Sequence, residues 1–325
     1  MATLVVGFDE FVGAAVTDLL LNRGEQVLGS SLESDDMALQ LVRKNRLLAH
    51  NNAHHLEDLG MFNLLQFSTS HFQIPVQKVL FLPNFAFIHN NKAQLLADTL
   101  TVIALCKQLK PAHLVVASHH SIYYPHGHSS MSCQESLNHP INLEAATCRS
   151  MELLLHGLSA SSDIPCSIVR LFDAYGQDAD SNNIINKLYS HLTDETEDES
   201  LELNNDIRDF VYIDDAAQGI CRILDHTALP SPDWQSDTER ADISEHRFVI
   251  YNLGTGDGTA ISGVLQALRK QLKHSRSAGI TINNQSKKIV ADIDKLRHQI
   301  GFVPSTRLEE GIAALAAQLN VTENV

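Results

Sequence analysis

The chain has 325 residues, of which 44% are hydrophobic and 19% charged, and its formal net charge at pH 7 is −15. These values are typical of a globular protein with a sizeable core. The negative charge argues against nucleic acid and anionic membrane as partners, since both attract clustered lysine and arginine. No apolar run reaches the ~20 residues that a transmembrane helix needs, and the first residues resemble no secretion signal. Five scattered cysteines without CxxC spacing predict reduced thiols and a cytoplasmic location.

The first half of the chain alternates short apolar runs with amphipathic stretches. Nearly continuous apolar strands separated by helices are typical of a parallel sheet that is buried on both faces. We therefore expect residues 1–175 to form a Rossmann-type, doubly wound α/β domain. The predicted strands are Thr3–Val6, Gln26–Gly29, Val79–Leu82, Leu114–Ala117 and Ser167–Phe172, and the predicted helices are Phe11–Asn22, Lys92–Leu109 and Leu143–Leu158.

Beyond residue 175 the composition changes. An acidic run, Thr193–Glu202, and a stretch rich in proline, serine and aspartate, Leu229–Glu245, are predicted to be solvated loops. The elements between and after them are short. We expect residues 176–325 to form mainly a smaller C-terminal α/β lobe, interleaved with the end of the sheet domain. Its predicted extended segments are Arg208–Ile213 and Phe248–Asn252, and its predicted helices are Ser262–Leu272 and Leu308–Leu319.

The first strand-turn-helix unit resembles a dinucleotide-binding turn with two positions changed. Gly7 and Gly13 stand where the fingerprint has its first and last glycines, but the middle position is Glu10. Its side chain would block a pyrophosphate, and its carboxylate could satisfy the helix end itself. The acid that holds the adenosine ribose, expected about 20 residues on, is replaced by Ser31, and Asp58 is a weak candidate for an adenine contact. We expect no cofactor, with NAD as the alternative if the family's site is retained.

Several segments, taken in order, resemble the extended short-chain dehydrogenase/reductases, and among them the NAD-dependent epimerases/dehydratases of sugar nucleotides, with UDP-glucuronate 4-epimerase the most similar. The resemblance runs from Thr3 to about Leu319. It implies a Rossmann domain for NAD and a C-terminal lobe for a UDP-sugar. The segments are Val5–Gly13, Ala117–Tyr123, Leu143–Cys148 and, most specifically, R-D-F-V-Y-I-D-D at Arg208–Asp215 and Y-N-L-G at Tyr251–Gly254.

The catalytic positions that the resemblance implies are occupied by other residue types. The family uses a tyrosine four residues before a lysine on one helix, with a serine or threonine at the end of the preceding strand, while hydride moves to NAD. Here the tyrosine position is Glu144, the lysine position is Cys148 and the serine or threonine position is His119. None of the three residue types that this chemistry needs is present, although Glu144 and His119 could form a different acid–base pair.

The resemblance also places Arg170, Asp173 and Arg208 at the substrate. Arg208 would approach the diphosphate, and Asp173 replaces a threonine or asparagine of the family. The Arg208 segment is equally consistent with core packing and an arginine–aspartate pair. With Glu10, Glu144 and Asp173 facing few cations, the cleft is predicted to disfavour a dinucleotide together with a nucleoside-diphosphate sugar.

A cluster of histidines follows the fourth predicted strand. Imidazole and thiolate suit zinc or nickel, but the spacing of this cluster matches no metal motif. We therefore predict no metal site. The cluster consists of His119, His120, His126 and His128, followed by Cys133 and His139.

These departures favour a pseudoenzyme, a non-catalytic relative of the family that acts as a binding, regulatory or scaffolding subunit. Two alternatives stay open: an active, divergent NAD-dependent epimerase/dehydratase, and a sugar-nucleotide sensor without chemistry. The resemblance also implies a homodimer, formed by the helices Lys92–Leu109 and Leu143–Leu158 as a four-helix bundle. A heterodimer with an active paralogue is a variant of the same prediction.

Overall fold

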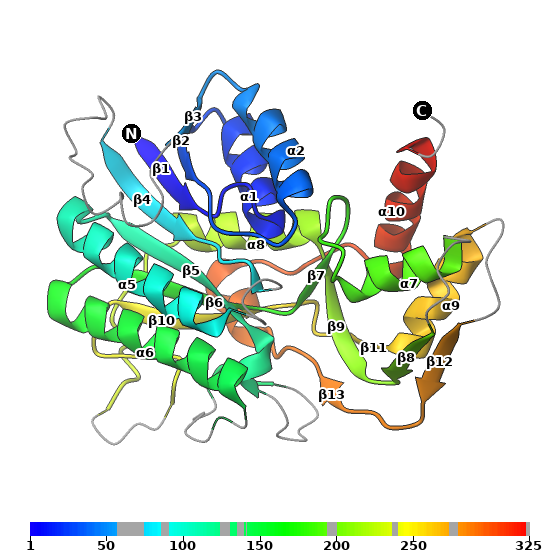
Figure 1. Ribbon diagram of the computed structural model, residues 1–325. Coiled ribbons are helices and arrows are strands. Elements are labelled where there is room, and N and C mark those ends of the chain that lie inside the picture. The colour runs from blue at the N-terminus through cyan, green and yellow to red at the C-terminus, as the bar shows by residue number, and fades with distance from the viewer. Residues whose placement is uncertain are drawn as a thin grey trace.

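The computed structural model describes residues 1–56, 75–85, 91–123, 131–134, 140, 142–193, 200–235, 240–272 and 279–322. Figure 1 shows two unequal lobes: a large sheet with helices on both faces, and a smaller lobe that carries the C-terminus. Within the described ranges every helix is too short or too polar to span a lipid bilayer.

The large lobe is built on seven parallel strands in the order β10-β6-β5-β4-β1-β2-β3. The predicted α/β class with a parallel sheet is confirmed. In the register, Leu4 of β1 pairs with Leu28 on one side and Val79 on the other. The chain turns in opposite directions from β1 and from β4, so the crevice between them lies at the carboxyl ends of the strands. The strands are β1 (Ala2–Val6), β2 (Gln26–Ser30), β3 (Ala53–His55), β4 (Val76–Phe81), β5 (His113–His119), β6 (Cys166–Leu171) and β10 (Phe248–Leu253).

Two layers of helices cover this sheet, and each layer closes its own apolar core. One face is covered by α1 (Phe11–Asn22), α2 (Met37–Leu48) and α8 (Ile213–Asp225), and the other by α5 (Lys92–Leu109) and α6 (Leu143–Ser162). The strands are apolar on both sides because both faces are buried, which is the pattern from which the parallel sheet was expected.

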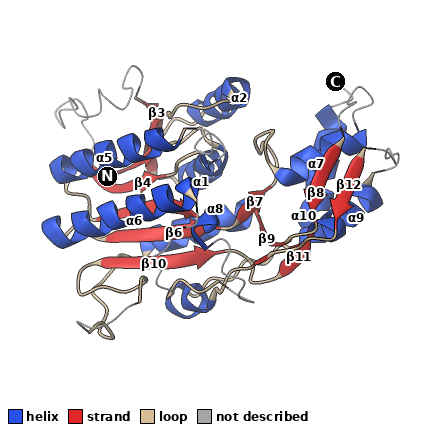
Figure 2. Cartoon of the chain, turned by 60° about the horizontal axis from the view of Figure 1, so that its bottom comes forward, coloured by secondary structure: helices blue, strands red, loops and turns tan. Residues whose placement is uncertain are grey.

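The smaller lobe packs three helices around a third apolar core (Figure 2). Strand β10 and helix α8 belong to the large lobe although both follow residue 175, so the chain crosses between the lobes more than once. The helices are α7 (Ile184–Thr193), α9 (Ile261–Gln271) and α10 (Leu308–Thr322). The strands are β7 (Asp173–Tyr175), β9 (Ile207–Tyr212), β11 (Gly258–Ala260) and β13 (Lys288–Ile289) in one sheet, and β8 (Leu201–Asn204) with β12 (Ile280–Asn283) in another. Short helical turns span His120–Tyr123 and Leu296–Ile300.

The predicted loops are only partly described. Of the acidic run Thr193–Glu202, residues 194–199 lie outside the described residues, and its end forms the start of β8 rather than a loop. In the stretch Leu229–Glu245 the described residues form no helix or strand.

Candidate functional site

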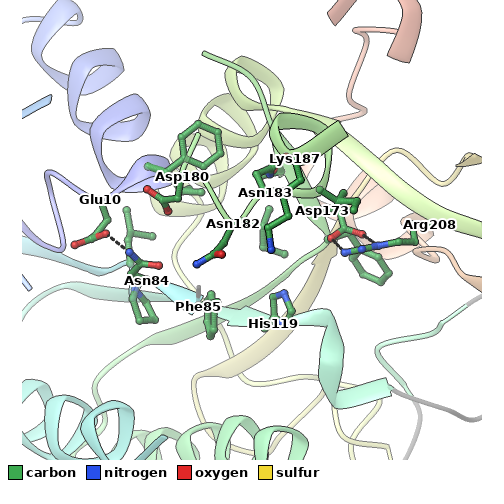
Figure 3. A pocket seen from close by; sticks show the side chains of 18 of the residues that line it. Glu10, Asn84, Phe85, His119, Asp173, Asp180, Asn182, Asn183, Lys187 and Arg208 are labelled. Carbon is green, nitrogen blue, oxygen red and sulfur yellow. Dashed lines mark hydrogen bonds and ion pairs between the residues drawn. The ribbon is translucent and has the colours of Figure 1, made fainter. Parts of the chain in front are cut away.

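A cavity of about 600 Å³ lies between the two lobes at the carboxyl ends of the central strands. Figure 3 shows Glu10 at one end of it and Arg208 at the other, with Phe85 and His119 on the side of the sheet and residues 180–187 opposite them. The cavity is therefore a crevice of the kind in which doubly wound α/β proteins bind ligands.

The turn after β1 requires glycine at two positions for reasons of space. Gly7 has φ +85°, and a Cβ there would lie 2.3 Å from the carbonyl oxygen of Leu82. A Cβ on Gly13 would lie 1.7 Å from the carbonyl oxygen of Gly7. These glycines let helix α1 pack directly against the end of β1, whether or not a nucleotide is bound.

Glu10 points away from the helix that it precedes. Its carboxylate accepts hydrogen bonds from Asn84 Nδ2 at 2.6 Å and Gln40 Nε2 at 2.9 Å, and the residue is 2% exposed. It makes no side-chain hydrogen bond to the N-terminal amides of α1. The expectation that Glu10 satisfies the helix end is therefore wrong, because two side-chain amides hold the carboxylate on the cavity side (Figure 3).

Burial also changes the charge of Glu10. Removal from water, reinforced by the carboxylates of Asp180 and Asp9, raises the pKa of Glu10 to about 8. Glu10 is therefore largely uncharged at pH 7. At this position the cleft therefore carries less negative charge than the sequence predicted.

Replacing Glu10 by glutamine is expected to remove a pH dependence of stability. The pKa of this carboxyl is raised from 4.5 to about 8 on folding, so its contribution is fully present below the unfolded value and is lost as the pH rises through the folded value. At about 1.36 kcal/mol per pH unit, the wild type should lose about 2 kcal/mol relative to Glu10→Gln between roughly pH 6 and pH 7.5. Urea denaturation of both proteins at the two pH values measures this difference, and parallel behaviour of the two would contradict it.

Ser31, at the position of the ribose acid, is engaged with the turn. Its hydroxyl donates to Asp9 Oδ2 at 2.6 Å and lies 3.3 Å from His55 Nε2. Burial raises the pKa of Asp9, against the hydrogen bond from Ser31, which lowers it. Asp58, the candidate for an adenine contact, lies outside the described residues.

The structure brings His119 and Glu144 together. His119 ends β5 and Glu144 lies in the first turn of α6, whose start is fixed by Asn142, the Oδ1 of which accepts from the amide of Ala145 at 2.8 Å. His119 Nδ1 lies 3.6 Å from Glu144 Oε1, and both side chains line the cavity. The distance is too long for a hydrogen bond, so the two groups face the cavity as neighbours.

Cys148, one turn further along α6 than Glu144, does not reach the cavity. Its side chain is buried in the apolar core between the sheet and α5 and α6. Burial raises the pKa of its thiol to about 12, so it stays protonated and offers no charge where the family has a lysine.

Asp173 and Arg208 form an ion pair on the cavity wall. Arg208 Nε donates to Asp173 Oδ2 at 2.7 Å and Nη2 donates to Oδ1, while His120 Nε2 lies 3.2 Å from the same Oδ1. Burial raises the pKa of Asp173, but Arg208 outweighs burial and the net shift is downward. Burial lowers the pKa of His120 to about 3, so this imidazole is neutral near pH 7. The expected arginine–aspartate pair is thus present, and it lines the cavity.

Arg170 lies apart from the cavity, contrary to the expected place at the substrate. Arg170 is fully buried and does not line the cavity. Its guanidinium pairs with Glu152 at 2.8 Å, and its Nη1 donates to Tyr123 Oη at 2.7 Å. The carboxylate of Glu152, on α6, holds the guanidinium in this position. Arg170 is therefore part of the core.

Helix α2 is joined to the segment after β7 by ion pairs and hydrogen bonds of Arg43 and Arg46, which the sequence did not predict. We call these contacts the Arg43 clamp. Arg43, fully buried, donates to Asp180 Oδ1 at 2.7 Å and to the carbonyl oxygen of Asp178, and Arg46 Nη1 pairs with Asp178 Oδ2 at 2.5 Å. The clamp joins α2 to the segment that carries one wall of the cavity, beside Glu10. Lys187 on that wall was also missed.

No group of three or more histidine, cysteine, aspartate or glutamate side chains in the described ranges is arranged to hold a metal ion. The ring centroids of His119 and His120 lie 4.2 Å apart with the rings tilted by 32°, and Cys133 is buried. Three further members of the histidine cluster, His126, His128 and His139, lie outside the described residues.

Comparison with known proteins identifies the family. Residues 3–234 match the NAD dependent epimerase/dehydratase family. An uncharacterised 37.6 kDa protein in the cld 5′ region of Escherichia coli O111:H- is 28% identical over 330 residues, which are 96% of each chain. A UDP-glucuronate 4-epimerase of Thermodesulfobacterium geofontis is 25% identical and is matched over 95% of this chain and 93% of its own.

Among solved structures, the UDP-glucuronic acid 4-epimerase of Bacillus cereus in complex with UDP-glucuronic acid and NAD superposes with a TM-score of 0.78 at 20% identity, covering 99% of this chain and 100% of that one. This likeness shows a shared two-lobed fold. The family match over residues 3–234 confirms the expected membership: the chain belongs to the NAD-dependent epimerase/dehydratase family.

Proposed function

We propose that this chain binds a nucleoside-diphosphate sugar between its lobes and does not carry out the nicotinamide-dependent step of its family. The observation that carries the proposal is the buried Glu10 side chain, which fills the place over the nucleotide turn where the family's middle glycine leaves room for a pyrophosphate. Binding of this kind serves a sensor, a regulatory subunit or an enzyme that works without nicotinamide.

The residues at the three positions expected to contact NAD all argue against its binding. Glu10 occupies the approach to the turn, Ser31 is bonded to Asp9, and the buried thiol of Cys148 stands where a lysine would hold the nicotinamide ribose. These residues do not fit NAD in the way that the resemblance implies. We therefore assign no reaction step to NAD.

The opposite end of the cavity suits a sugar nucleotide. Lys187 supplies positive charge for a diphosphate beside the Arg208–Asp173 pair, and Phe85 and Phe172 supply apolar surface. The related Bacillus cereus structure holds UDP-glucuronic acid, which makes UDP-sugars the first ligands to test.

Calorimetric titration with UDP, UDP-glucose, UDP-glucuronate and NAD tests the proposal. We expect binding of the UDP compounds and none of NAD at micromolar concentration. Lys187→Met should weaken UDP binding about 10-fold or more, the value of one charge-assisted hydrogen bond, whereas Lys270→Met, at the exposed end of α9, should leave it unchanged. Absence of heat with every UDP compound would overturn the proposal.

A second candidate is the family's own NAD-dependent epimerisation. It is favoured by the family match over residues 3–234 and by the presence of two titratable groups, His119 and Glu144, at the family's catalytic positions. NAD that co-purifies with the protein, or turnover of UDP-glucuronate that is lost in Glu144→Gln, would establish this candidate in place of the first. Turnover that survives in Glu144→Gln would indicate a contaminant.

We further propose a homodimer formed through α5 and α6. These helices lie side by side on the outer face of the sheet, and they expose leucines: Leu100 is 54%, Leu143 68% and Leu153 53% exposed. Exposed leucines on two neighbouring helices fit a four-helix bundle with a second copy of the chain.

Leu153→Asp is expected to dissociate this dimer, because it would place an unpaired carboxylate in a desolvated interface. A cost of about 3 kcal/mol corresponds to a roughly 100-fold higher dissociation constant. Sedimentation velocity across a concentration series measures this constant. Leu229→Asp, an equally drastic change at another leucine that is 66% exposed, is the matched control, and a wild type that sediments as a monomer at all concentrations would refute the dimer.

A further inference from the structure

His119 and Glu144 reach the same cavity from different elements, at the end of β5 and in the first turn of α6. Their side chains are 25% and 22% exposed, so both are partly withdrawn from water but open to a ligand. A carboxylate base and an imidazole that face one cavity are a minimal apparatus for moving a proton.

The surroundings of His119 fix which of its nitrogens is the donor. Nδ1 accepts a hydrogen bond from the backbone amide of Ser121 at 3.3 Å, which leaves Nε2 as the nitrogen that donates. The ring is held by stacking on Phe85, with 5.1 Å between centroids, and by contact with His120 at 4.2 Å. His119 thus presents an Nε2–H donor in a fixed orientation.

A chain of paired side chains, His120, Asp173 and Arg208, lies beside His119 and Glu144. His120 Nε2 lies 3.2 Å from Asp173 Oδ1, and Asp173 is held by Arg208. Because each of these groups is paired with the next, they keep the ring of His119 in place and do not compete for a proton in the cavity.

We infer that His119 and Glu144 form an acid–base pair that enolises a ketone-bearing nucleoside-diphosphate sugar without a redox cofactor. The inference rests on the proposed binding of such nucleotides. The Glu144 carboxylate removes the proton from the carbon next to the carbonyl. The electron pair of the broken C–H bond forms the carbon–carbon double bond, and the π pair of the carbonyl moves to its oxygen, which accepts a hydrogen bond from His119 Nε2–H.

The reaction is completed when the same carboxyl returns a proton to the carbon. Nothing is oxidised or reduced, so the step needs no NAD, and the carbonyl substrate must be supplied by a separate oxidation. A carboxylate base combined with an imidazole donor is a known arrangement for enolisation. Glutamate is also a suitable replacement for tyrosine here, because it takes up a proton without needing a neighbouring lysine.

The test is solvent exchange into a keto-sugar nucleotide. The protein is incubated in D2O with UDP-4-keto-6-deoxyglucose, and deuterium at the carbons next to the carbonyl is followed by mass spectrometry. We expect incorporation well above the rate in buffer. Glu144→Gln should lower the rate about 100-fold or more, and His119→Phe, which retains the stacking on Phe85, should lower it about 100-fold. Glu245→Gln, an exposed glutamate outside the cavity, should leave the rate unchanged.

Calorimetry with the same nucleotide separates the two proposals. Binding with exchange at the buffer rate would overturn the acid–base pair and leave the proposed function intact, whereas absence of binding would overturn both. Exchange that persists in Glu144→Gln, in a variant that binds UDP and unfolds like the wild type, would also refute the assignment of the base.

Discussion

Glu152→Gln is expected to lower the free energy of unfolding by about 3–5 kcal/mol, the cost of leaving a buried charge without its partner. Arg170 and Glu152 are both fully buried and bonded through two parallel contacts, Nε to Oε1 at 2.9 Å and Nη2 to Oε2 at 2.8 Å. Ser118 Oγ donates to the same Oε1 at 2.9 Å. Replacing the carboxylate by an amide removes the charge and sets an NH₂ group against a donor.

Denaturation in guanidinium chloride measures this loss. The matched control is the double variant Glu152→Met/Arg170→Met, which removes both charges and fills similar volume with apolar atoms. It should be markedly more stable than Glu152→Gln, since buried ion pairs contribute little once both partners are replaced. A loss below about 1 kcal/mol in Glu152→Gln would show that water or another group reaches the guanidinium.

Gly13→Ala is the second change with a large expected effect, at least about 3 kcal/mol, the upper end of overpacking costs. The added Cβ would lie 1.7 Å from the carbonyl oxygen of Gly7 and 3.3 Å from Cα of Phe8, and both are backbone atoms that cannot rotate away. Helix α1 would have to move off β1 and open the turn that carries Glu10. Thermal unfolding monitored by circular dichroism measures the effect.

Gly157→Ala in α6 is the matched control for this change. A Cβ there meets no atom within 4 Å, and alanine is favoured over glycine in a helix by about 0.5–1 kcal/mol. The same chemical change should therefore stabilise the protein at position 157 and destabilise it at position 13. Equal effects at both positions would contradict the steric explanation.

The elements that were predicted from the sequence are those whose apolar residues face the core. Phe11–Asn22 and Lys92–Leu109 have the predicted bounds because their buried positions recur with helical spacing. Helix α2 was missed because its pattern is inverted. Leu41 is 56% exposed, while Arg43 is buried by its partners in the other lobe, and tertiary contacts of that kind leave no periodic signal.

Helix α8 was missed for a different reason. It begins at Ile213 directly after β9 ends at Tyr212, with no glycine, proline or other breaker between them. The change from strand to helix is marked only by the acidic first turn, Asp214 and Asp215, which suits the positive end of the helix dipole.

The candidate site was predictable where it lies at strand ends and unpredictable where it depends on side-chain contacts between elements far apart in the sequence. The glycine spacing directed attention to Glu10 and the resemblance to His119, Glu144 and Arg208, and all four line the cavity. The sequence did not show which side chains bind the Glu10 carboxylate, which are amides from α2 and from the segment after β4. Those contacts involve residues far apart in sequence, and no local pattern encodes them.

The Arg43 clamp has a consequence for how the two lobes separate. Arg43 is fully buried and paired with Asp180 beside Glu10, whereas Arg208, at the far end of the cavity, is 28% exposed and pairs with Asp173. Parting the lobes at the Arg43 end would expose an unpaired guanidinium, so we expect them to rotate about α2 as a hinge. Such a rotation widens the cavity first beside Arg208, and ligand entry and release would then proceed from the sugar-binding end.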